Sequence, residues 1–455
     1  MQVIPGEIEA RNIAEPVRPS NRVIRGHAFS RRASASNAAE YAQISDPSQE
    51  CSKYGVEQVT QMQQQNDFPT ASQIASIVDG DDEANSLWSD IQKSGIIPSG
   101  VDVKQQQGSE HMGISMGSYN SQEDPDCWWS ANQCVTPKHD GLPSDLSSCP
   151  EPDTWGLTFD DGPNCTHNSF YDFLSQNNLK ATLFYIGSNV VNWPYQAQRG
   201  IVDGHDICVH TWSHRYMTTL TNDQVFAELY YTAKVIKQIT GVTPTCWRPP
   251  YGDVDDRVRA IAYGLGLRTI LWKADTDDWN IVPSGSESTQ QIDQNYQNII
   301  DKANSESPIV LTHEINAQTM KEFQKMYPKI KEAYKNVVPL TACQNVTKPY
   351  PDSDISYPAF SDFVGGNVNA SGLPSGDSIK VDASAKYQPT NLNDTKVGYG
   401  HPQSGSSSGS SSSSSSKSDS SDSSDNNNGA AGLVASQASF AALSGAALLS
   451  LLALL

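Results

Sequence analysis

The chain has no excess of positive charge, and this absence excludes one broad class of function. Lys and Arg number 31 against 51 Asp and Glu in 455 residues, which gives a formal net charge of −20 at pH 7. A nucleic-acid partner needs basic clusters that face the phosphates, so no such partner is expected. The acidic residues are spread along the chain, which indicates solubility rather than recognition of a substrate.

No Cys-x-x-Cys pair occurs among the eight cysteines, so a zinc finger is not expected. An even number of scattered cysteines instead predicts disulfides and an oxidising compartment, and it leaves the pairing open. Four Asn-x-Ser/Thr sequons agree with that compartment. They predict glycosylation at Asn164, Asn345, Asn369 and Asn393.

The two ends of the chain carry different signals. The first 35 residues contain several arginines but no apolar run, so no signal peptide is visible. Small residues at Asn428-Gly429-Ala430 are followed by a short uncharged spacer and an apolar run over residues 438–455. This layout predicts a glycosylphosphatidylinositol (GPI) attachment signal that is removed on anchoring, with Asn428 as the attachment residue. A tail-anchored helix is the alternative, but the Ser-rich spacer and the sequons favour the lipid anchor.

Composition divides the chain into five segments. Only the middle segment is rich enough in apolar and aromatic residues to bury a full core. The Ser-, Pro- and Asn-rich sequence after it cannot form a core. The predicted segments are a disordered leader (1–50), a polar lead-in that packs on the next segment (51–150), a folded domain (151–343), a linker and stalk (344–428) and a cleaved hydrophobic propeptide (429–455).

Short apolar runs alternate with helical patterns from residue 154 onward, which predicts an α/β fold. The clearest helix covers residues 222–240, with Asn222 or Thr221 as its N-cap and Gly241 as its stop. Alternation of this kind implies a parallel sheet, either open or closed into a barrel, and seven units approach the eight of a complete barrel. The predicted strands cover residues 155–159, 181–186, 207–210, 245–248, 269–274, 308–312 and 337–341.

Two adjacent carboxylates, Asp160 and Asp161, end the first predicted strand within the sequence Thr-Phe-Asp-Asp-Gly-Pro. Neighbouring residues of a strand point to opposite faces, so two such carboxylates on a continuing strand would not share a site. At the end of a strand, where Gly-Pro bends the chain, both side chains can reach one cavity. One carboxylate can then bind a metal ion while the other moves a proton.

His210 and His214 follow the third predicted strand with His-x-x-x-His spacing. This spacing lets two imidazoles meet one ion if the segment turns after the strand. With one carboxylate they make a His, His, Asp site whose open position takes water, as in catalytic metal sites. Alone, the spacing is more often a hydrogen-bonded surface pair, but beside the twin Asp we favour a metal site.

Three further segments place polar residues after strands, where α/β folds carry their chemistry. Arg248 precedes Pro-Pro-Tyr-Gly; it could hold a carboxylate ionised while the turn aims a backbone N–H at the cavity as an oxyanion donor. His313 could be a general acid if a carboxylate such as Asp275 keeps it protonated. Taken singly, each of these residues is more often structural.

The order of these motifs resembles the polysaccharide deacetylase (NodB-homology) family, the family-four carbohydrate esterases. The family pattern is Thr-Phe-Asp-Asp-Gly-Pro, His-Ser/Thr-x-x-His, Arg-x-Pro-Tyr, Asp-x-x-Asp-Trp and Leu-x-His-Asp, and the resemblance covers about residues 150–343. The lead-in at Cys127-Trp128-Trp129, the Ser-rich stalk and the anchor signal look most like fungal chitin deacetylases. The resemblance implies a distorted (β/α) barrel with fewer than eight units. It also implies metal-dependent removal of N-acetyl groups from chitin, giving chitosan and acetate.

The resemblance assigns a role to each matching residue. Asp160 would be the general base, oriented by Arg248. His313 would be the general acid, tuned by Asp275. The implied ligands of one divalent ion, zinc or cobalt, are Asp161, His210 and His214. The other implied site residues are Tyr251, whose N–H would hold the oxyanion, Leu311, which would line the acetyl-methyl pocket, and Trp279, which would wall the site.

Glu314 departs from the family pattern, which usually has Asp directly after the acid His. Since His313 itself is kept, adjusted support for the acid is expected rather than lost activity. Two alternatives stay open: another acetylated polysaccharide such as acetylxylan or peptidoglycan as the substrate, or a wall protein that binds glycan without turnover. The complete Asp, Asp, His, His, His set argues against the second. A monomer at the outer membrane face and in the cell wall is expected.

Overall fold

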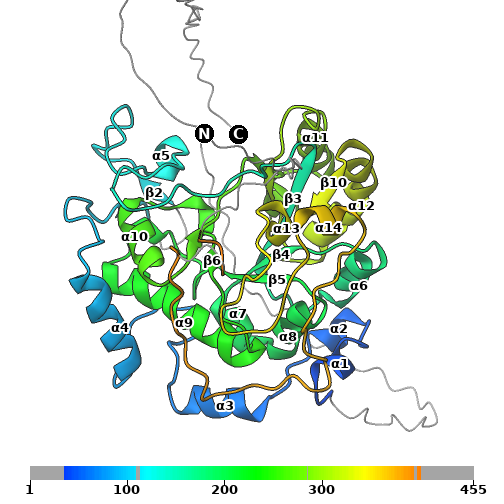
Figure 1. Cartoon of the computed structure of the whole chain (residues 1–455), viewed down its shortest axis with the longest axis horizontal. Helices are drawn as coiled ribbons and strands as arrows, with labels where there is room; N and C mark the ends of the chain where they lie inside the picture. Colours follow the sequence, from blue (N-terminus) through cyan, green and yellow to red (C-terminus); the bar gives the residue numbers. More distant parts are fainter. Residues whose placement is uncertain (1–34, 109–112, 284, 394–396, 401–455) are drawn as a thin grey trace, which may run out of the picture. The chain divides into compact units, whose positions relative to one another are not determined.

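A curled parallel sheet surrounded by helices forms the centre of the structure (Figure 1). The structure is a computed structural model that describes residues 35–108, 113–283, 285–393 and 397–400. The predicted leader up to residue 34 lies outside the described residues, as do the predicted Ser-rich stalk and the GPI signal with Asn428. None of the helices in the described ranges is long and apolar enough to cross a membrane.

The sheet has eight strands in the order β7-β6-β5-β4-β3-β9-β8, and β10 pairs with β3 beside this path. Each of these pairs is parallel. The order ends at β7 and β8, which follow each other in the chain, so the sheet curls into a distorted barrel that is open between them. The predicted α/β fold and incomplete barrel are therefore confirmed. The strands are β3 (Thr154–Gly162), β4 (Thr182–Tyr185), β5 (Asp206–Val209), β6 (Cys246–Trp247), β7 (Arg268–Thr269), β8 (Ala274–Asp275), β9 (Ile309–Leu311) and β10 (Asn336–Val338), with a separate antiparallel pair, β1 (Gln105–Gln106) and β2 (Ile114–Ser115).

Each of the seven predicted strands corresponds to a strand of the sheet, but one prediction merged two elements. The run 269–274 was predicted as a single strand, whereas β7 ends at Thr269 and β8 begins at Ala274. The apolar residues between them leave the sheet, because β7 pairs with β6 and β8 pairs with β9 on the other side of the opening. A continuous apolar run therefore hid the point where the barrel breaks.

Strand β3 lies in the middle of the sheet and is buried along its whole length. Trp155, Leu157 and Phe159 are fully buried, and Thr158 between the last two is fully buried as well. Burial on both faces is typical of a parallel strand that is covered on its two sides. The two carboxylates at the end of β3 are thus carried by the most constrained strand of the fold.

Helices cover the outside of the barrel (Figure 1). Helix α9 (Asn222–Thr240) confirms the clearest sequence prediction: Thr221 forms a capping box with Gln224, and Gly241 closes the helix with a φ of 82°. The other helices are α1 (Ala38–Tyr41), α2 (Pro47–Glu50), α3 (Glu57–Gln64), α4 (Asp82–Lys93), α5 (Trp129–Asn132), α6 (Asn168–Gln176), α7 (Gly187–Asn192), α8 (Pro194–Val202), α10 (Asp256–Gly264), α11 (Thr289–Ile300), α12 (Ala317–Ala333), α13 (Leu340–Cys343) and α14 (Phe360–Val364), with short 3-10 turns at Met217–Thr219, Pro250–Gly252 and Asp278–Asn280.

Residues 35–50 differ from the disorder predicted for the whole leader. They form α1 and α2, which dock on the barrel beside α8 and α6 (Figure 1). Asn168 donates to the carbonyl oxygens of Tyr41 and Ile44, both at 2.9 Å, and a disulfide joins Cys51 to Cys165. These contacts join residues more than a hundred positions apart, so local composition gave no sign of them.

The described residues 344–393 and 397–400 differ from the linker predicted there, because they pack on the folded domain. Tyr350 and Tyr399 donate to the carboxylate of Asp206, at 3.2 and 2.6 Å. Arg268 donates to the carbonyl oxygen of Gly400 at 3.0 Å. Asp206 is the first residue of β5, so this segment covers the end of the barrel where the strands begin.

All eight cysteines form disulfides, which confirms the prediction of disulfides and supplies the pairing that the sequence left open. The Cys208–Cys246 bridge joins neighbouring strands β5 and β6, and Cys149–Cys343 ties the start of the domain to its end. The four pairs are Cys51–Cys165, Cys127–Cys134, Cys149–Cys343 and Cys208–Cys246.

Candidate active site

The predicted site residues gather at the end of the barrel where the strands finish. Because the strands are parallel, the segments that leave β3, β5, β6, β8 and β9 meet at one edge of the sheet. Several of these segments turn through non-glycine residues with left-handed backbone, which is costly and typical of functional loops. These residues and their φ values are Asp161 (70°), Thr211 (65°), His214 (56°), Tyr251 (59°) and Asp277 (53°).

Asp161, His210 and His214 form a cluster whose ligand-type atoms face one another. Nε2 of His214 lies 3.2 Å from Oδ1 of Asp161, and Nε2 of His210 lies 3.5 Å from the same oxygen. That oxygen is buried and has no hydrogen-bond partner among the described residues. Burial alone would raise the pKa of Asp161, but the two imidazoles hold it well below its ordinary value. An ionised carboxylate that faces two imidazole nitrogens fits a divalent cation.

The tautomer of His210 suits metal binding. Its Nδ1 lies 2.8 Å from the carbonyl oxygen of Arg248. A carbonyl oxygen can only accept, so Nδ1 carries the hydrogen and Nε2 keeps a free lone pair toward Asp161. The fold therefore orients this imidazole before any ligand arrives.

Glu228 of α9 holds the loop that carries the two histidines. The amide N–H groups of Trp212 and Ser213 both donate to its Oε2 at 2.8 Å. The Ser213 hydroxyl and the amide of Ala75 donate to Oε1 at 2.6 and 2.8 Å. This fully buried carboxylate was missed by the sequence reasoning, because a Glu inside an amphipathic helix carries no signal for such a role.

Asp160 lies beside the cluster and is held by Arg248. Nη1 of Arg248 donates to Oδ1 of Asp160 at 2.7 Å and to the Thr158 hydroxyl at 2.9 Å. Both side chains are buried, and the guanidinium lies 4.1 Å over the ring of Phe184. The second carboxylate oxygen of Asp160 lies 3.9 Å from Nε2 of His210, which places it next to the cluster without making it the nearest ligand.

His313 has a different carboxylate partner from the one expected. Its Nδ1 lies 2.6 Å from Oδ1 of Asp278, and its backbone N–H donates to Oδ2 of the same residue at 2.9 Å. Asp275, which we expected to hold this imidazole, instead accepts the amide N–H of Asp277 at 2.9 Å. The left-handed turn at Asp277 brings Asp278, rather than Asp275, under the imidazole. The direct partner is thus the second Asp of the Asp-x-x-Asp-Trp motif.

Electrostatics at His313 and Asp275 follow from these contacts. Burial alone would lower the pKa of His313, but the Asp278 carboxylate outweighs it and raises that pKa to about 10. Burial and the neighbouring Asp277 raise the pKa of Asp275 to about 7. His313 therefore holds a proton at neutral pH, as a general acid must.

The three remaining predicted site residues surround this centre with different degrees of exposure. Tyr251 lies in the Pro250–Gly252 turn, with its ring 4.7 Å from that of His214 and stacked at 4.0 Å on Tyr216. Leu311 ends β9 and is almost fully buried, whereas Trp279 is 39% exposed. The structure thus brings all the predicted site residues to one end of the barrel, with Trp279 at its surface.

Glu314 is fully buried behind the site and belongs to a polar cluster that the sequence did not predict. Its Oε1 accepts from the Tyr171 hydroxyl at 3.3 Å, and its Oε2 lies 3.5 Å from Nδ1 of His167. A Cβ on Gly162 would come within 1.6 Å of Oε1, so the carboxyl group fills the space that this glycine leaves. Burial raises the pKa of Glu314 well above its ordinary value, which favours the neutral carboxylic acid over the carboxylate.

The four predicted glycosylation sites fall into two groups. Asn369 and Asn393 are exposed, whereas Asn164 and Asn345 are half-buried. The Asn164 side chain donates to the carbonyl oxygen of Ile315 at 2.7 Å, and that of Asn345 accepts from the amide of Phe360 at 3.0 Å. A glycan at Asn369 or Asn393 would displace less structure than one at the other two residues.

The chain is similar in sequence and in structure to known proteins. A sequence model of the polysaccharide deacetylase family matches residues 147–270. Chitin deacetylase 2 of Cryptococcus neoformans var. grubii is 49% identical over 350 residues, which cover 75% of this chain and 75% of the relative. Chitin deacetylase of Amylomyces rouxii is 46% identical over 314 residues, which cover 67% of this chain and 72% of the relative. The solved chitin deacetylase of Colletotrichum lindemuthianum aligns with 28% identity and a TM-score of 0.41, covering 44% of this chain and 92% of the other.

Proposed function

The chain belongs to the polysaccharide deacetylase family, and on that premise we propose that it hydrolyses the N-acetyl groups of chitin, giving chitosan and acetate. The observation that carries the proposal is the meeting of three units at one end of the barrel: the Asp161–His210–His214 cluster, the Asp160–Arg248 pair and the His313–Asp278 pair. The relatives named as chitin deacetylases, at 46–49% identity over most of both chains, support chitin as the substrate.

Asp161, His210 and His214 would hold one divalent cation, zinc or cobalt. The fit rests on the buried, unpartnered oxygen of Asp161 and on the two imidazole nitrogens that face it. When bound, such a cation polarises the acetamide carbonyl group and makes a coordinated water more acidic.

Asp160 acts as the general base in this proposal. Its carboxylate takes a proton from the attacking water, whose oxygen forms a bond to the acetamide carbon. Arg248 fixes the direction of this carboxylate, because its guanidinium is buried and bonds one carboxylate oxygen at 2.7 Å. The other carboxylate oxygen is left to face the cluster.

His313 acts as the general acid. It gives its Nε2 proton to the amide nitrogen as the carbon–nitrogen bond breaks, so that glucosamine leaves as an amine and acetate remains. The Tyr251 N–H, in the strained Pro250–Gly252 turn, would donate to the oxyanion of the tetrahedral intermediate. Leu311 would line the pocket for the acetyl methyl group, and Trp279 would wall the sugar site.

We further propose that the enzyme works as a monomer at the outer face of the plasma membrane and in the cell wall. The support is in the sequence: the GPI signal with Asn428, the sequons and the even set of cysteines. The four disulfides agree with an oxidising compartment.

Acetate release from chitin oligomers tests the proposed function, with acetylxylan and peptidoglycan as parallel substrates. The protein should release acetate from chitin oligomers fastest, lose that activity on chelation and regain it on addition of zinc or cobalt. Asp160→Asn should abolish release while cation binding, measured by calorimetry, persists. Faster release from acetylxylan, or activity that is indifferent to chelation, would contradict the proposal.

A further inference from the structure

Two partly exposed tryptophans lie beside the active site and have no part in the mechanism above. Trp129 begins α5 and lies outside the stretch that matches the family, residues 147–270. Trp272 lies between β7 and β8, at the opening of the barrel. Their ring centroids are 4.8 Å apart at an interplanar angle of 58°, so the two rings form one corner.

Each of the two tryptophans contacts a residue that lies beside the catalytic groups. The Trp129 ring lies against Gly252, where a Cβ would come within 2.3 Å of it. Gly252 directly follows Tyr251, whose ring is 4.7 Å from that of His214. On the other side, the Trp272 centroid is 5.7 Å from the guanidinium carbon of Arg248, the residue that holds Asp160. The pair therefore reaches the base through Arg248, and it reaches the metal cluster through Gly252 and Tyr251.

The two rings differ from the buried tryptophans around them. Trp128 and Trp212 are at most 1% exposed, and their indole N–H groups donate to Asp253 and to the Thr70 carbonyl oxygen. Trp129 and Trp272 are only partly buried, and neither indole N–H has a hydrogen-bond partner among the described residues. A partly exposed aromatic ring with an unused donor at its rim is typical of a ligand-binding surface.

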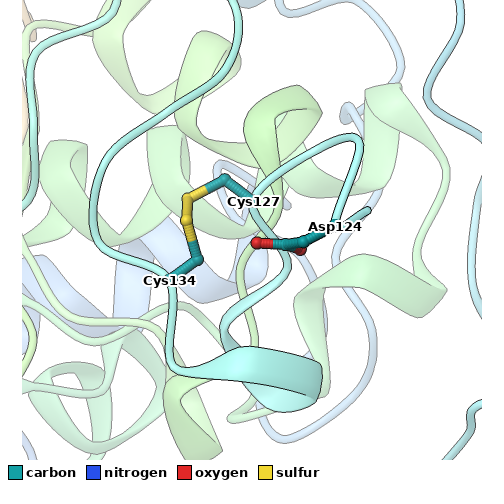
Figure 2. Close-up of side chains that lie close together, drawn as sticks. All are labelled: Asp124, Cys127 and Cys134. Carbon is teal, nitrogen blue, oxygen red and sulfur yellow. A yellow bond between two sulfur atoms is a disulfide. The ribbon is translucent and has the colours of Figure 1, made fainter. Parts of the chain in front are cut away.

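The loop that carries Trp129 is held rigidly. Figure 2 shows the short helix α5 inside the loop that the Cys127–Cys134 disulfide closes, with Asp124 beside the bridge. Because the two sulfurs bond each other, these three residues hold the loop and leave no thiolate for a metal ion. Nη1 of Arg259 donates to the Cys127 carbonyl oxygen at 2.6 Å, and Nη2 donates to that of Cys134 at 2.9 Å. A ring fixed in this way binds a ligand with little further loss of entropy.

We propose that Trp129 and Trp272 form a binding subsite for the sugar next to the one that loses its acetyl group. A pyranose ring offers an apolar C–H face for the indole and hydroxyl oxygens for the two free N–H groups. The subsite rests on the proposed function, and it makes the enzyme select polymeric N-acetylglucosamine over short units. The lead-in is then part of the substrate groove rather than only a cover for the barrel.

The dependence of kcat/KM on the length of the chitin oligomer tests the subsite. Trp129 is the residue to substitute, because Trp272 also contacts Arg248. For Trp129→Leu, kcat/KM should fall about tenfold on a chitin pentamer, the size of one lost aromatic contact, and by less than about twofold on monomeric N-acetylglucosamine, which has no second sugar to place in the subsite. Trp129→Phe keeps an aromatic face and should recover most of the pentamer value. Trp193→Leu, in a half-buried ring that packs on Tyr54, is the matched control and should change neither substrate.

Direct binding separates the subsite from the catalytic proposal. Calorimetric titration of the pentamer into metal-free protein should show about tenfold weaker binding for Trp129→Leu than for the unmodified chain. Equal losses on monomeric N-acetylglucosamine and the pentamer, or equal binding by both proteins, would overturn the subsite. If the unmodified chain binds the pentamer through Trp129 yet releases no acetate, the subsite stands and the proposed function fails.

Discussion

The Asp278→Asn substitution distinguishes between the two carboxylates that could control the acid. Asp278 bonds the His313 imidazole at 2.6 Å, whereas Asp275 bonds the amide of Asp277. Removing the Asp278 charge should therefore lower the pKa of His313, and Asp275→Asn should lower it much less. The two substitutions are chemically identical and three residues apart, so each is the matched control for the other.

The expected size follows from the pKa values. His313 has a pKa of about 10 in the fold, against about 6.5 for an unperturbed imidazole. The difference of about 3.5 units corresponds to about 5 kcal/mol at 1.36 kcal/mol per unit. Without Asp278, only the weaker attraction of the Asp161 and Asp160 carboxylates opposes the lowering of the pKa by burial, so we expect a fall of at least about two units. A cation held by Asp161 would repel the imidazolium in both variants alike, so it reduces the absolute pKa and leaves the comparison intact.

The assay is the pH dependence of kcat/KM for acetate release. The acid must be protonated, so activity is lost as pH rises through the pKa of His313. Asp278→Asn should move this alkaline limb to lower pH by at least about two units, and Asp275→Asn by less than about one. The NMR titration of His313 in metal-free protein should show the same order without turnover.

The reasoning would be refuted if the alkaline limb of the pH profile were unchanged in Asp278→Asn. It would also be refuted if Asp275→Asn moved this limb by as much as Asp278→Asn does. Asp278 also accepts the His313 backbone N–H, so its substitution could destabilise the fold as well as change the pKa of His313. Thermal unfolding of each variant shows whether a loss of activity at alkaline pH comes from unfolding.

Two further predictions concern buried carboxyl groups behind the site. Glu228→Gln replaces one acceptor oxygen with a donor, which leaves either the two loop N–H groups or the Ser213 and Ala75 donors unsatisfied, at a cost of about 1–3 kcal/mol per group. Calorimetry should show weaker cation binding, and kcat should be largely restored at saturating cation. Unchanged cation affinity would contradict the role of Glu228 in holding the loop. Burial raises the pKa of Glu314 and so favours its neutral form, and Glu314→Gln should therefore retain near-normal acetate release. Glu314→Asp removes one buried methylene over Gly162 and should cost about 1 kcal/mol in unfolding free energy. A Gln variant less stable than the Asp variant would show that Glu314 is ionised.

The strands and the catalytic motifs could be predicted because their signals are local. Each apolar run near residues 155, 182, 207 and 309 became a strand, and parallel pairing then brought the polar residues after these strands together. The choice between Asp275 and Asp278 could not be predicted in this way. It depends on the left-handed turn at Asp277, and a residue other than Gly gives little warning of such a backbone.

The limits of the folded unit depend on contacts that no local pattern encodes. Trp212 lies between His210 and His214 in the sequence, and its indole donates to the carbonyl oxygen of Thr70 at 3.0 Å. Glu228 holds the same loop and also accepts the amide of Ala75. A chain that began near residue 120 would lack Thr70 and Ala75. The indole N–H of Trp212 and one carboxylate oxygen of Glu228 would then lose these hydrogen bonds. The Asp161–His210–His214 cluster therefore depends on sequence well before residue 151, and the predicted boundary at 151 marks where the motifs begin rather than where the folded unit begins.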